Sequence, residues 1–410
     1  MRLFLYGYNY TPELTGIGRY TGEMATWLAA RGHKVTVLTG MPYYPEWRVH
    51  PAYKGKGWMR EWRDGVEVLR SPLHVPSKVT GKGRIMLELS FAVSCLYWWP
   101  HIFSRRWDAV LVICPPSLTI FLPLLLARQQ GINLILHFQD FQLDVARKLG
   151  ILPHGLSVSM LDRLDRFFLD QANMNTAISE GMLARLRDKG IPAHRLKLLP
   201  NWADLETIRP GSDNNDLRKE LGFNSEVIVL YAGSMGEKQG LEVILESARL
   251  TERRTDIRYI IAGEGGTKAR LMASAKNQSL ENVLFLPLQP EERFPQFLAV
   301  GDIHLVVQKA EASDLLMPSK LTNILAAGRP FVTTALPGTE LAKVAEESQA
   351  GLLVPPEDSG ALAQAIIKLA DGRGLRQKMG KKARQYAENH LSRDVILSRF
   401  EDALLNLAKY

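Results

Sequence analysis

The sequence has 410 residues, which is too long for one ordinary hydrophobic core, so two domains are expected. Its hydrophobic content of 46% and charged content of 23% are globular values, which exclude a fibrous or disordered chain. The net charge of +8 is unevenly placed, because eleven Lys and Arg residues and only four acidic ones lie between Arg48 and Arg106. Such a stretch suits nucleic acid or an anionic membrane surface.

The two cysteines, Cys95 and Cys114, both lie in apolar runs. They form no CxxC pair, and no secretory leader begins the chain. Reduced thiols and a cytoplasmic location are therefore expected.

The chain opens with an apolar strand over residues 2–10. A turn containing Gly16, Gly18 and Arg19 follows, then a helix over 20–31 and a second strand over 33–39. This β-α-β unit predicts a parallel sheet. No third glycine stands at position 21, so a dinucleotide fingerprint is poorly supported. The two glycines either let backbone N–H groups approach a phosphate or sugar, or only form a tight turn.

Residues 41–84 interrupt the α/β rhythm and are expected to form long loops with a short strand at 66–70. Residues 85–103 are nearly all apolar, but Pro100 breaks them and they are too short for a membrane span. A buried or interfacial helix is expected instead.

Aromatic residues accompany the basic ones in this part of the chain, as they do at membrane interfaces. This favours a membrane surface over nucleic acid, with a merely solvated basic face as the alternative. The aromatic residues are Trp58, Trp62, Tyr97, Trp98, Trp99 and Trp107.

A strand over 109–114, a helix over 118–130 and a strand over 133–137 come next. His137, Asp140 and Asp144 fall just past the last of these strands, at the edge where ligands bind in open α/β sheets. Either Asp140 or His137 could orient or deprotonate an incoming hydroxyl, although a lone histidine at a strand end is equally a structural residue.

Helices over 156–172 and 180–189 and short strands at 176–179 and 196–199 complete the first half. Residues 201–215 have linker composition. We therefore expect an N-terminal domain over 1–200, joined by a C-terminal helix near 393–410, and a second domain over 201–392. Two Rossmann-like halves of this kind make the cleft between them the natural active site.

The second half repeats the rhythm of the first. A strand over 227–232 is followed by Gly233, Gly236 and Lys238, and a strand over 257–262 by the glycine-rich residues 263–266. Alternating strands and helices continue to about residue 408.

Residues 317–330, MPSKLTNILAAGRP, predict a helix over 320–327 that Ser319 caps and Gly328 ends. Its free N–H groups and Lys320 would suit a phosphate or diphosphate. An ordinary capped helix between two strands is the alternative.

Four segments occur in a fixed order: YAGSMGEKQGLE, IAGEG, PSKLTNILAAGRPFV and GLLVPPEDSGALAQAI. With TGIGRY near the N-terminus and LPNWADL at the junction, they resemble glycosyltransferase family 4, whose members are retaining enzymes with the two-domain GT-B fold. The resemblance covers essentially the whole chain. Within the family, the sequence is most similar to bacterial exopolysaccharide and O-antigen transferases. This resemblance implies fucose transfer from GDP-fucose in colanic acid synthesis.

The resemblance implies that the loop after the first strand of the second domain holds the donor diphosphate through Gly233, Gly236 and Lys238. Ser234 stands where the family often has arginine, which would leave more of the phosphate charge to Lys238. The Glu-x7-Glu motif of the family is degraded, because Asn323 replaces the second glutamate and Leu315 the first. Asparagine can still bond ribose hydroxyls.

Further residues match family positions around the donor and acceptor. Gly263 and Glu264 match the loop that borders the nucleotide. The N-terminal loop that closes over the donor is matched by Gly16, Gly18 and Arg19. Asp140 or His137 matches the polar residue on the acceptor side.

The implied reaction is transfer with retention to a saccharide on undecaprenyl diphosphate at the inner membrane. No Asp-x-Asp pair is present, so we expect neither a metal nor another cofactor, with Lys238 and Lys320 supplying positive charge. A nucleotide-sugar 2-epimerase of the same fold and a non-enzymatic sugar-binding protein are the alternatives. A dinucleotide dehydrogenase is less favoured, because no full GxGxxG follows any strand.

Overall fold

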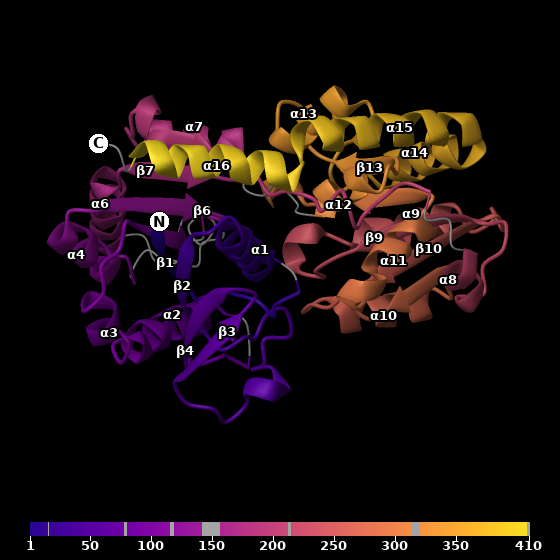
Figure 1. Ribbon diagram of the computed structural model, residues 1–410. Coiled ribbons are helices and arrows are strands. Elements are labelled where there is room, and N and C mark those ends of the chain that lie inside the picture. Colours follow the sequence, from indigo (N-terminus) through magenta and orange to yellow (C-terminus); the bar gives the residue numbers. More distant parts are fainter. Residues whose placement is uncertain are drawn as a thin grey trace. The chain divides into compact units, whose positions relative to one another are not determined.

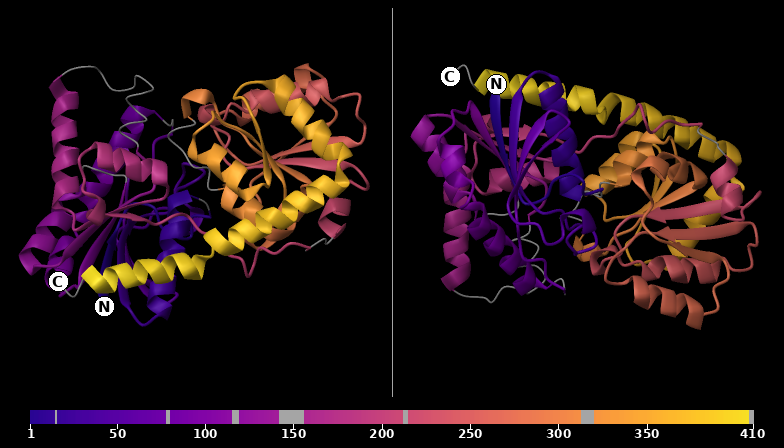
Figure 2. Two further views of the ribbon diagram at one scale, coloured as in Figure 1. Left: turned by 90° about the horizontal axis from the view of Figure 1, so that it is seen from above. Right: turned by 60° about the horizontal axis from the view of Figure 1, so that its bottom comes forward.

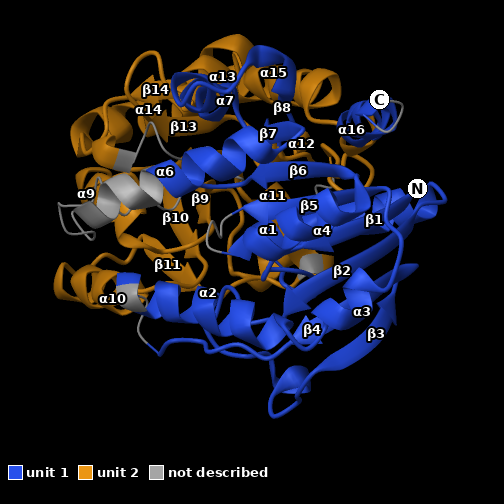
Figure 3. Cartoon of the chain, turned by 90° about the vertical axis from the view of Figure 1, so that its left-hand side faces the viewer, with its two compact units in different colours: residues 1–200, 396–410 blue, residues 201–395 orange. Residues whose placement is uncertain are grey.

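A computed structural model describes residues 1–14, 16–77, 80–114, 119–141, 156–211, 215–312 and 320–407. The chain divides into two compact units (Figure 3). Unit 1 contains residues 1–200 and 396–410, and unit 2 contains residues 201–395. Each unit is built on its own sheet, with helices on both faces (Figures 1 and 2).

The sheet of unit 1 has eight strands in the order β3-β4-β2-β1-β5-β6-β7-β8. All neighbouring pairs are parallel except β3 with β4. The strands are β1 (Arg2–Tyr6), β2 (Lys34–Gly40), β3 (Met59–Arg63), β4 (Val66–Ser71), β5 (Ala109–Cys114), β6 (Asn133–Phe138), β7 (Met174–Ala177) and β8 (Leu196–Leu198).

The described helices of unit 1 alternate with these strands, as the sequence predicts. They are α1 (Gly16–Ala30), α2 (Gly81–Cys95), α3 (Trp99–Phe103), α4 (Phe121–Gln130), α6 (Leu156–Gln171), α7 (Glu180–Asp188) and, from residue 396 onward, α16 (Arg393–Leu407). Glu401 of α16 is buried, and it accepts hydrogen bonds from Arg31 (2.9 Å) and pairs with His33 Nε2 at 2.8 Å. These contacts tie the C-terminal helix to the first β-α-β unit.

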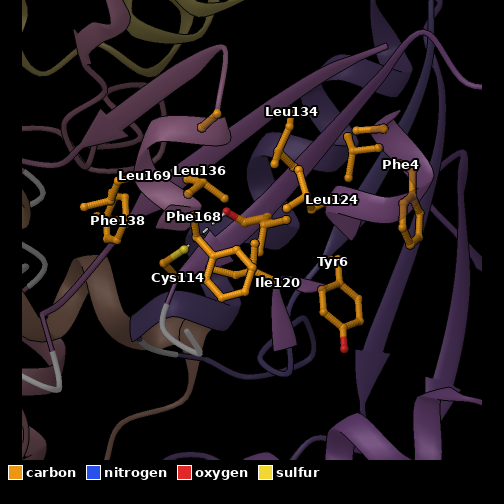
Figure 4. Close-up of a cluster of buried hydrophobic side chains, with 14 of the residues drawn as sticks. Phe4, Tyr6, Cys114, Ile120, Leu124, Leu134, Leu136, Phe138, Phe168 and Leu169 are labelled. Atoms are coloured by element: carbon orange, nitrogen blue, oxygen red, sulfur yellow. Dashed lines mark hydrogen bonds between the residues drawn. The ribbon is translucent and has the colours of Figure 1, made fainter. Parts of the chain in front are cut away.

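The core of unit 1 packs one face of the sheet against its helices (Figure 4). Phe4 and Tyr6 of β1 lie in this core, together with Cys114 of β5 and Phe168 of α6. Both cysteines are free and buried, and burial raises the pKa of the Cys95 thiol to about 12. Neither thiol is therefore suited to act as a nucleophile.

The sheet of unit 2 has six parallel strands in the order β11-β10-β9-β12-β13-β14. They are β9 (Val227–Ala232), β10 (Ile257–Ala262), β11 (Val283–Leu286), β12 (Ile303–Val306), β13 (Phe331–Thr334) and β14 (Gly351–Val354). The described helices are α8 (Asn215–Glu220), α9 (Glu242–Leu250), α10 (Lys268–Asn277), α11 (Phe294–Val300), α12 (Lys320–Ala326), α13 (Glu340–Ser348), α14 (Ser359–Asp371) and α15 (Arg373–His390).

Strand β9 shows why its sequence is an unbroken apolar run. Val229 and Tyr231 belong to the core beneath α9 and α14, whereas Ile228 and Leu230 belong to the core beneath α11. A central parallel strand is covered on both faces, so alternate residues enter different cores and none of these four needs to be polar.

The structure corrects several expected elements. Residues 59–63 form the antiparallel edge strand β3 inside a region expected to be loops. Residues 85–103 form two helices, α2 and α3. Two helices were not expected: α8, which begins at the last residue of the predicted linker, and α13, whose cap Thr339 accepts a hydrogen bond from Ala342 N. Gly16 begins α1, so the glycine turn is the first turn of the helix.

The aromatic residues of the predicted belt divide into buried and exposed ones. Trp99 and Trp107 are buried against Phe4, and Trp98 donates to the carbonyl oxygen of Arg70 at 3.1 Å. Large aromatic rings contribute most when buried, and here they fill the core beside β1. No helix in the described part of the chain is both long and apolar enough to cross a bilayer.

Candidate active site

The carboxyl ends of β9 and β12 form the centre of the candidate site in unit 2. These two strands are neighbours at the point where the strand order reverses, which is where open α/β sheets bind ligands. Residues 233–236 follow β9, and residues 263–266 follow β10 beside it. The predicted glycines therefore reach one edge of the sheet.

The loops after β9 and β10 touch through their backbones. Gly233 N donates to Ala262 O at 2.9 Å, and Met235 N donates to Glu264 O at 2.8 Å. Gly263 has a φ of +144°, and a Cβ at this position would lie 1.9 Å from the carbonyl oxygen of Gly233. Only glycine fits such an approach, so the two loops are held as one surface.

Lys320, the first residue of α12, lies over this surface. Its Nζ is 3.6 Å from the centroid of the Tyr231 ring, and a Cβ on Gly233 would lie 3.0 Å from it. The residue is partly exposed, yet Nζ itself is inaccessible and has no hydrogen-bond partner among the described residues. Burial lowers the pKa of this amine to about 7. The arrangement places an amine on an aromatic face, with no hydrogen-bond partner for it in the described part of the chain.

Tyr231 is a residue that the sequence reasoning missed. Besides carrying Lys320 on its ring, it donates its hydroxyl proton to Ser234 O at 2.7 Å. It therefore links the lysine to the loop after β9. The sequence feature that could have pointed to Tyr231 is a hydroxyl-bearing side chain near the end of an otherwise aliphatic strand, shortly before the glycines.

Two further buried polar atoms lack partners at this edge of unit 2. Asn323 is one helical turn from Lys320, so the two side chains share a face of α12. The Oδ1 atom of Asn323 and the Nε2 atom of Gln308, just past β12, have no hydrogen-bond partner within the described chain. Buried polar groups are normally bonded, so unpaired ones beside an unpaired ammonium favour a polar ligand.

The other predicted donor residues lie around the same loops. Lys238 lies in a short 3₁₀ helix, η4 (Glu237–Gln239), and its carbonyl oxygen accepts from Lys309 N at 3.0 Å. Ser234 is exposed, and Gly236 N donates to Gln239 Oε1 at 3.0 Å. The Glu264 carboxylate pairs with Lys268 at 2.7 Å. Ser319 and Leu315 lie outside the described residues.

Helix α12 has seven residues, Lys320–Ala326, and the turn that follows it reaches Gly328, whose φ is +63°. Gly328 therefore ends the helix as predicted. So short a helix sums few peptide dipoles, which makes Lys320 rather than the helix axis the main source of positive charge here.

In unit 1, a buried carboxyl organises the loops after β1 and β2. Glu13 is 4% exposed and accepts hydrogen bonds from Asn9 Nδ2 (2.9 Å) and from the backbone N–H groups of Tyr43 and Tyr44 (3.2 Å each). Burial raises its pKa to about 8. The sequence reasoning did not single out Glu13, because a carboxylate before a glycine turn gives no sign of being buried.

The N-terminal glycines pack against this assembly. A Cβ on Gly18 would lie 2.3 Å from Glu13 Oε2, and one on Gly16 would lie 3.3 Å from the ring of Tyr44. Arg19 pairs with Glu23 at 2.6 Å. The contacts of the glycines are thus with unit 1 itself, and closure of this loop over a donor stays a prediction.

His137 and Asp140 follow β6 as expected, but their surroundings differ. His137 is 1% exposed, and its ring nitrogens lie 2.8 Å from Thr176 Oγ1 and 2.8 Å from Gln139 Nε2. Burial lowers its pKa to about 3, so the ring is neutral, and these contacts favour the structural alternative.

Asp140 lies in the loop beyond and is close enough to Tyr44 for its charge to help raise that phenol's pKa, after burial and Glu13. Asp144 lies outside the described residues. No group of three or more His, Cys, Asp or Glu side chains is placed to share a metal ion in the part of the chain that the structure describes.

Comparison with known proteins defines the class. Residues 15–202 match the model of the glycosyl transferase 4-like domain, and residues 213–386 match that of glycosyl transferases group 1. The chain belongs to this family of glycosyltransferases, and its fold is GT-B.

One relative covers nearly the whole chain. The sequence is 38% identical over 410 residues, 98% of either chain, to the putative colanic acid biosynthesis glycosyl transferase WcaI of Escherichia coli K12. Sucrose-phosphate synthase from Thermosynechococcus elongatus matches the structure with a TM-score of 0.76 at 16% identity, covering 99% of both chains. HepE of Anabaena, in complex with UDP, matches with a TM-score of 0.72 at 15% identity, covering 99% of this chain and 100% of its own.

Proposed function

We propose that this glycosyltransferase moves L-fucose from GDP-fucose, with retention and without a metal ion, to a saccharide carried on undecaprenyl diphosphate in exopolysaccharide synthesis of the colanic acid type. The observation that carries the proposal is the amine of Lys320 above the joined glycine loops of unit 2, which has no hydrogen-bond partner among the described residues. The similarity to WcaI supports the colanic acid assignment, and the fucose donor comes from that resemblance.

The donor diphosphate would bind at the carboxyl edge of the unit 2 sheet. Lys320, Lys238 and the backbone of the loop at Gly233 are the groups able to supply positive charge there. The Asn323 amide, one turn along α12, is suited to a ribose hydroxyl. That HepE, which shares the fold, was solved with UDP supports a nucleotide ligand.

The transfer then needs charge stabilisation more than a protein nucleophile. As the bond between the sugar C1 and the phosphate oxygen breaks, negative charge grows on the diphosphate, and Lys320 and Lys238 would stabilise it. The acceptor oxygen forms its bond to C1 on the same face, and its proton passes to the leaving phosphate oxygen. In unit 1, Asp140 is our candidate for orienting the acceptor hydroxyl.

An exposed apolar row on α2 supports binding to the cytoplasmic face of the inner membrane. Its side chains are 44–66% exposed and recur on one side of the helix. They are Ile85, Met86, Leu89 and Val93 of α2, with Leu96 and Tyr97 directly after it. The ring of Trp58, 47% exposed, lies 5.0 Å from Tyr97 and extends this apolar face.

Only part of the basic stretch is free to act on such a surface. Arg70 is fully buried and bonded to Glu61 at 2.6 Å, and Arg60 and Arg105 both pair with Glu67. Arg48, Lys54, Lys56 and Arg106 are exposed. The apolar face therefore supplies most of the proposed attachment, with weaker attraction to anionic lipid.

Thermal shift with a panel of GDP-, UDP-, ADP- and dTDP-sugars, in buffer containing EDTA, tests the donor. GDP-fucose is expected to raise the melting temperature most, because a ligand that binds only the folded state stabilises it.

Fucose transfer to the lipid-linked acceptor is expected to persist in EDTA. Activity that EDTA abolishes and magnesium or manganese restores would contradict metal independence. Conversion of the donor sugar without acceptor would identify an epimerase.

Vesicle sedimentation tests the membrane face. Met86→Ser/Val93→Ser removes two of its most exposed apolar groups and is expected to lower the fraction that sediments with phosphatidylglycerol vesicles several-fold. Leu250→Ser/Met272→Ser, which alters similarly exposed residues of unit 2, is the matched control. Equal sedimentation of both variants and the wild type would remove α2 from the proposal.

A further inference from the structure

A large basic cavity in unit 2 lies at the far end of α12 from Lys320. It has a volume of about 850 Å³, within the range of small-molecule sites. Its wall includes Gly328 and Pro330 after α12, Val300 of α11 and a long stretch of α15. Because α12 spans about 10 Å at 1.5 Å per residue, the cavity is separate from the candidate donor site.

Positive side chains dominate the lining of this cavity. Arg373 and Lys381 recur on the face of α15 that borders it, together with Gln377 and Gln385. A smaller hollow of about 340 Å³ shares three of these residues and adds Lys378 and Lys382. The charged residues lining the larger cavity are Arg218, Arg329, Arg373, Arg376, Lys381 and Arg384, against Asp302 and Glu388.

The two carboxylates are already engaged. Asp302 pairs with Arg218 at 3.1 Å, and Glu388 pairs with Arg384 at 2.7 Å. Within the described chain, Arg373 and Lys381 have no hydrogen-bond or ion-pair partner. The cavity therefore carries an excess of positive charge that its own acids do not neutralise.

Like charges repel one another at the centre of this group. Burial lowers the pKa of the Arg376 guanidinium; nearby Asp302 acts in the opposite direction, and repulsion from Arg373 and Arg218 lowers it further. Arg218 also has a buried Nε–H with no acceptor in the described structure. An anion in the cavity would relieve both costs.

The guanidinium groups are held in place by backbone carbonyls at helix ends. Arg376 donates to the carbonyl oxygen of Ala370, near the C-terminal end of α14, at 2.7 Å. Arg384 donates to the carbonyl oxygen of Ala326, the last residue of α12, at 2.9 Å. Arg329 donates to Ala299 O at 2.8 Å. These bonds use some of the five donors of each arginine and fix the direction of the rest, which is the preorganisation that phosphate recognition needs.

We propose that this cavity binds a phosphate or diphosphate group of a multiply charged ligand, at a site distinct from that of the nucleotide-sugar donor. The group would be supplied by a soluble phosphorylated compound or by a lipid headgroup, since both present the same oxygens. Binding neutralises the cluster and stabilises unit 2 from the C-terminal end of α12.

The test uses the full chain and inorganic pyrophosphate, with sodium chloride at matched ionic strength as the blank. Pyrophosphate is expected to raise the melting temperature of the wild type and of Lys320→Met alike. Arg373→Gln/Lys381→Gln, which changes exposed side chains, is expected to bind about tenfold more weakly by calorimetry. The control Lys276→Gln/Lys343→Gln removes the same charge from α10 and α13.

Wild-type binding by the cavity variant, or an equal loss in the control variant, would overturn the proposal. So would loss of binding in Lys320→Met alone, because it would assign the pyrophosphate to the donor site. Phosphatidylglycerol vesicles distinguish the two sources of phosphate. If the cavity variant sediments less than the wild type, a headgroup is the ligand; if sedimentation is unchanged while pyrophosphate binding falls, the ligand is soluble.

Discussion

Gly263→Ala is expected to destabilise the protein by about 2–4 kcal/mol and to lower transferase activity about 100-fold. The new Cβ would lie 1.9 Å from the carbonyl oxygen of Gly233, and a φ of +144° is strained for alanine. The neighbour is backbone, so it cannot turn aside as a flexible side chain would. The loop after β9 has to move, and its Gly233 lies beside Lys320.

Gly266→Ala is the matched control in the same loop. A Cβ there meets nothing within 4 Å, and its φ is outside the positive range. We expect its stability by chemical denaturation and its steady-state rate to stay near the wild-type values. If Gly263→Ala behaved in the same way, the contact between the two loops would have no part in holding the donor site.

Local signals explain why so much of the architecture could be predicted. Strands such as β9 and β10 are apolar runs that glycines end, and α15 has a length and composition that admit no other element. Elements whose signals are weak were missed. Strand β3, with the sequence MREWR, is mostly charged and lies on a sheet edge, and its pairing with β4 depends on a turn rather than on its own hydrophobicity.

Only those site residues that directly follow a predicted strand or begin a predicted helix could be found from the sequence. Gly233, Gly263 and Lys320 follow from their places beside predicted elements. The contact of Lys320 with Tyr231 joins residues 89 positions apart in the sequence, and no local pattern encodes such a pairing. For His137 the sequence left a catalytic and a structural role open, and its hydrogen bonds to Thr176 and Gln139 favour the structural one.

The aromatic stretch shows a similar limit. Composition located the region but could not say which rings are buried. Trp99 enters the core because α3 turns it toward Phe4, whereas Trp58 and Tyr97 stay outside. Burial is a property of the packed structure, so a count of tryptophans could not separate the two groups.

Lys320→Met is expected to lower kcat by about two orders of magnitude while making the protein more stable by about 1–3 kcal/mol. The methionine keeps the apolar packing on Tyr231 but removes the charge proposed to stabilise the leaving diphosphate. Stability rises because the buried ammonium lacks a hydrogen-bond partner within the described chain. Opposite changes in stability and rate are the mark of a residue retained for function.

The stability difference between the wild type and Lys320→Met should depend on pH in a defined direction. Burial lowers the pKa of Lys320 from 10.5 to about 7, so between these values the unfolded chain holds a proton that the folded protein has lost. The free energy of unfolding of the wild type therefore rises with pH through this window, whereas that of Lys320→Met does not gain this contribution. The stability difference between the two proteins should shrink from pH 7 to pH 10 in denaturant titrations.

Donor binding should depend on pH in the opposite direction. A diphosphate beside Nζ favours the protonated amine, so binding takes up a proton and donor affinity falls as pH rises above about 7. Calorimetry in buffers of different ionisation enthalpy measures that uptake. Lys343→Met, at an exposed lysine of α13, should change neither the stability profile nor the proton uptake. If Lys320→Met also left both unchanged, Lys320 would carry its proton at neutral pH without a ligand, and its placement on Tyr231 would be structural alone.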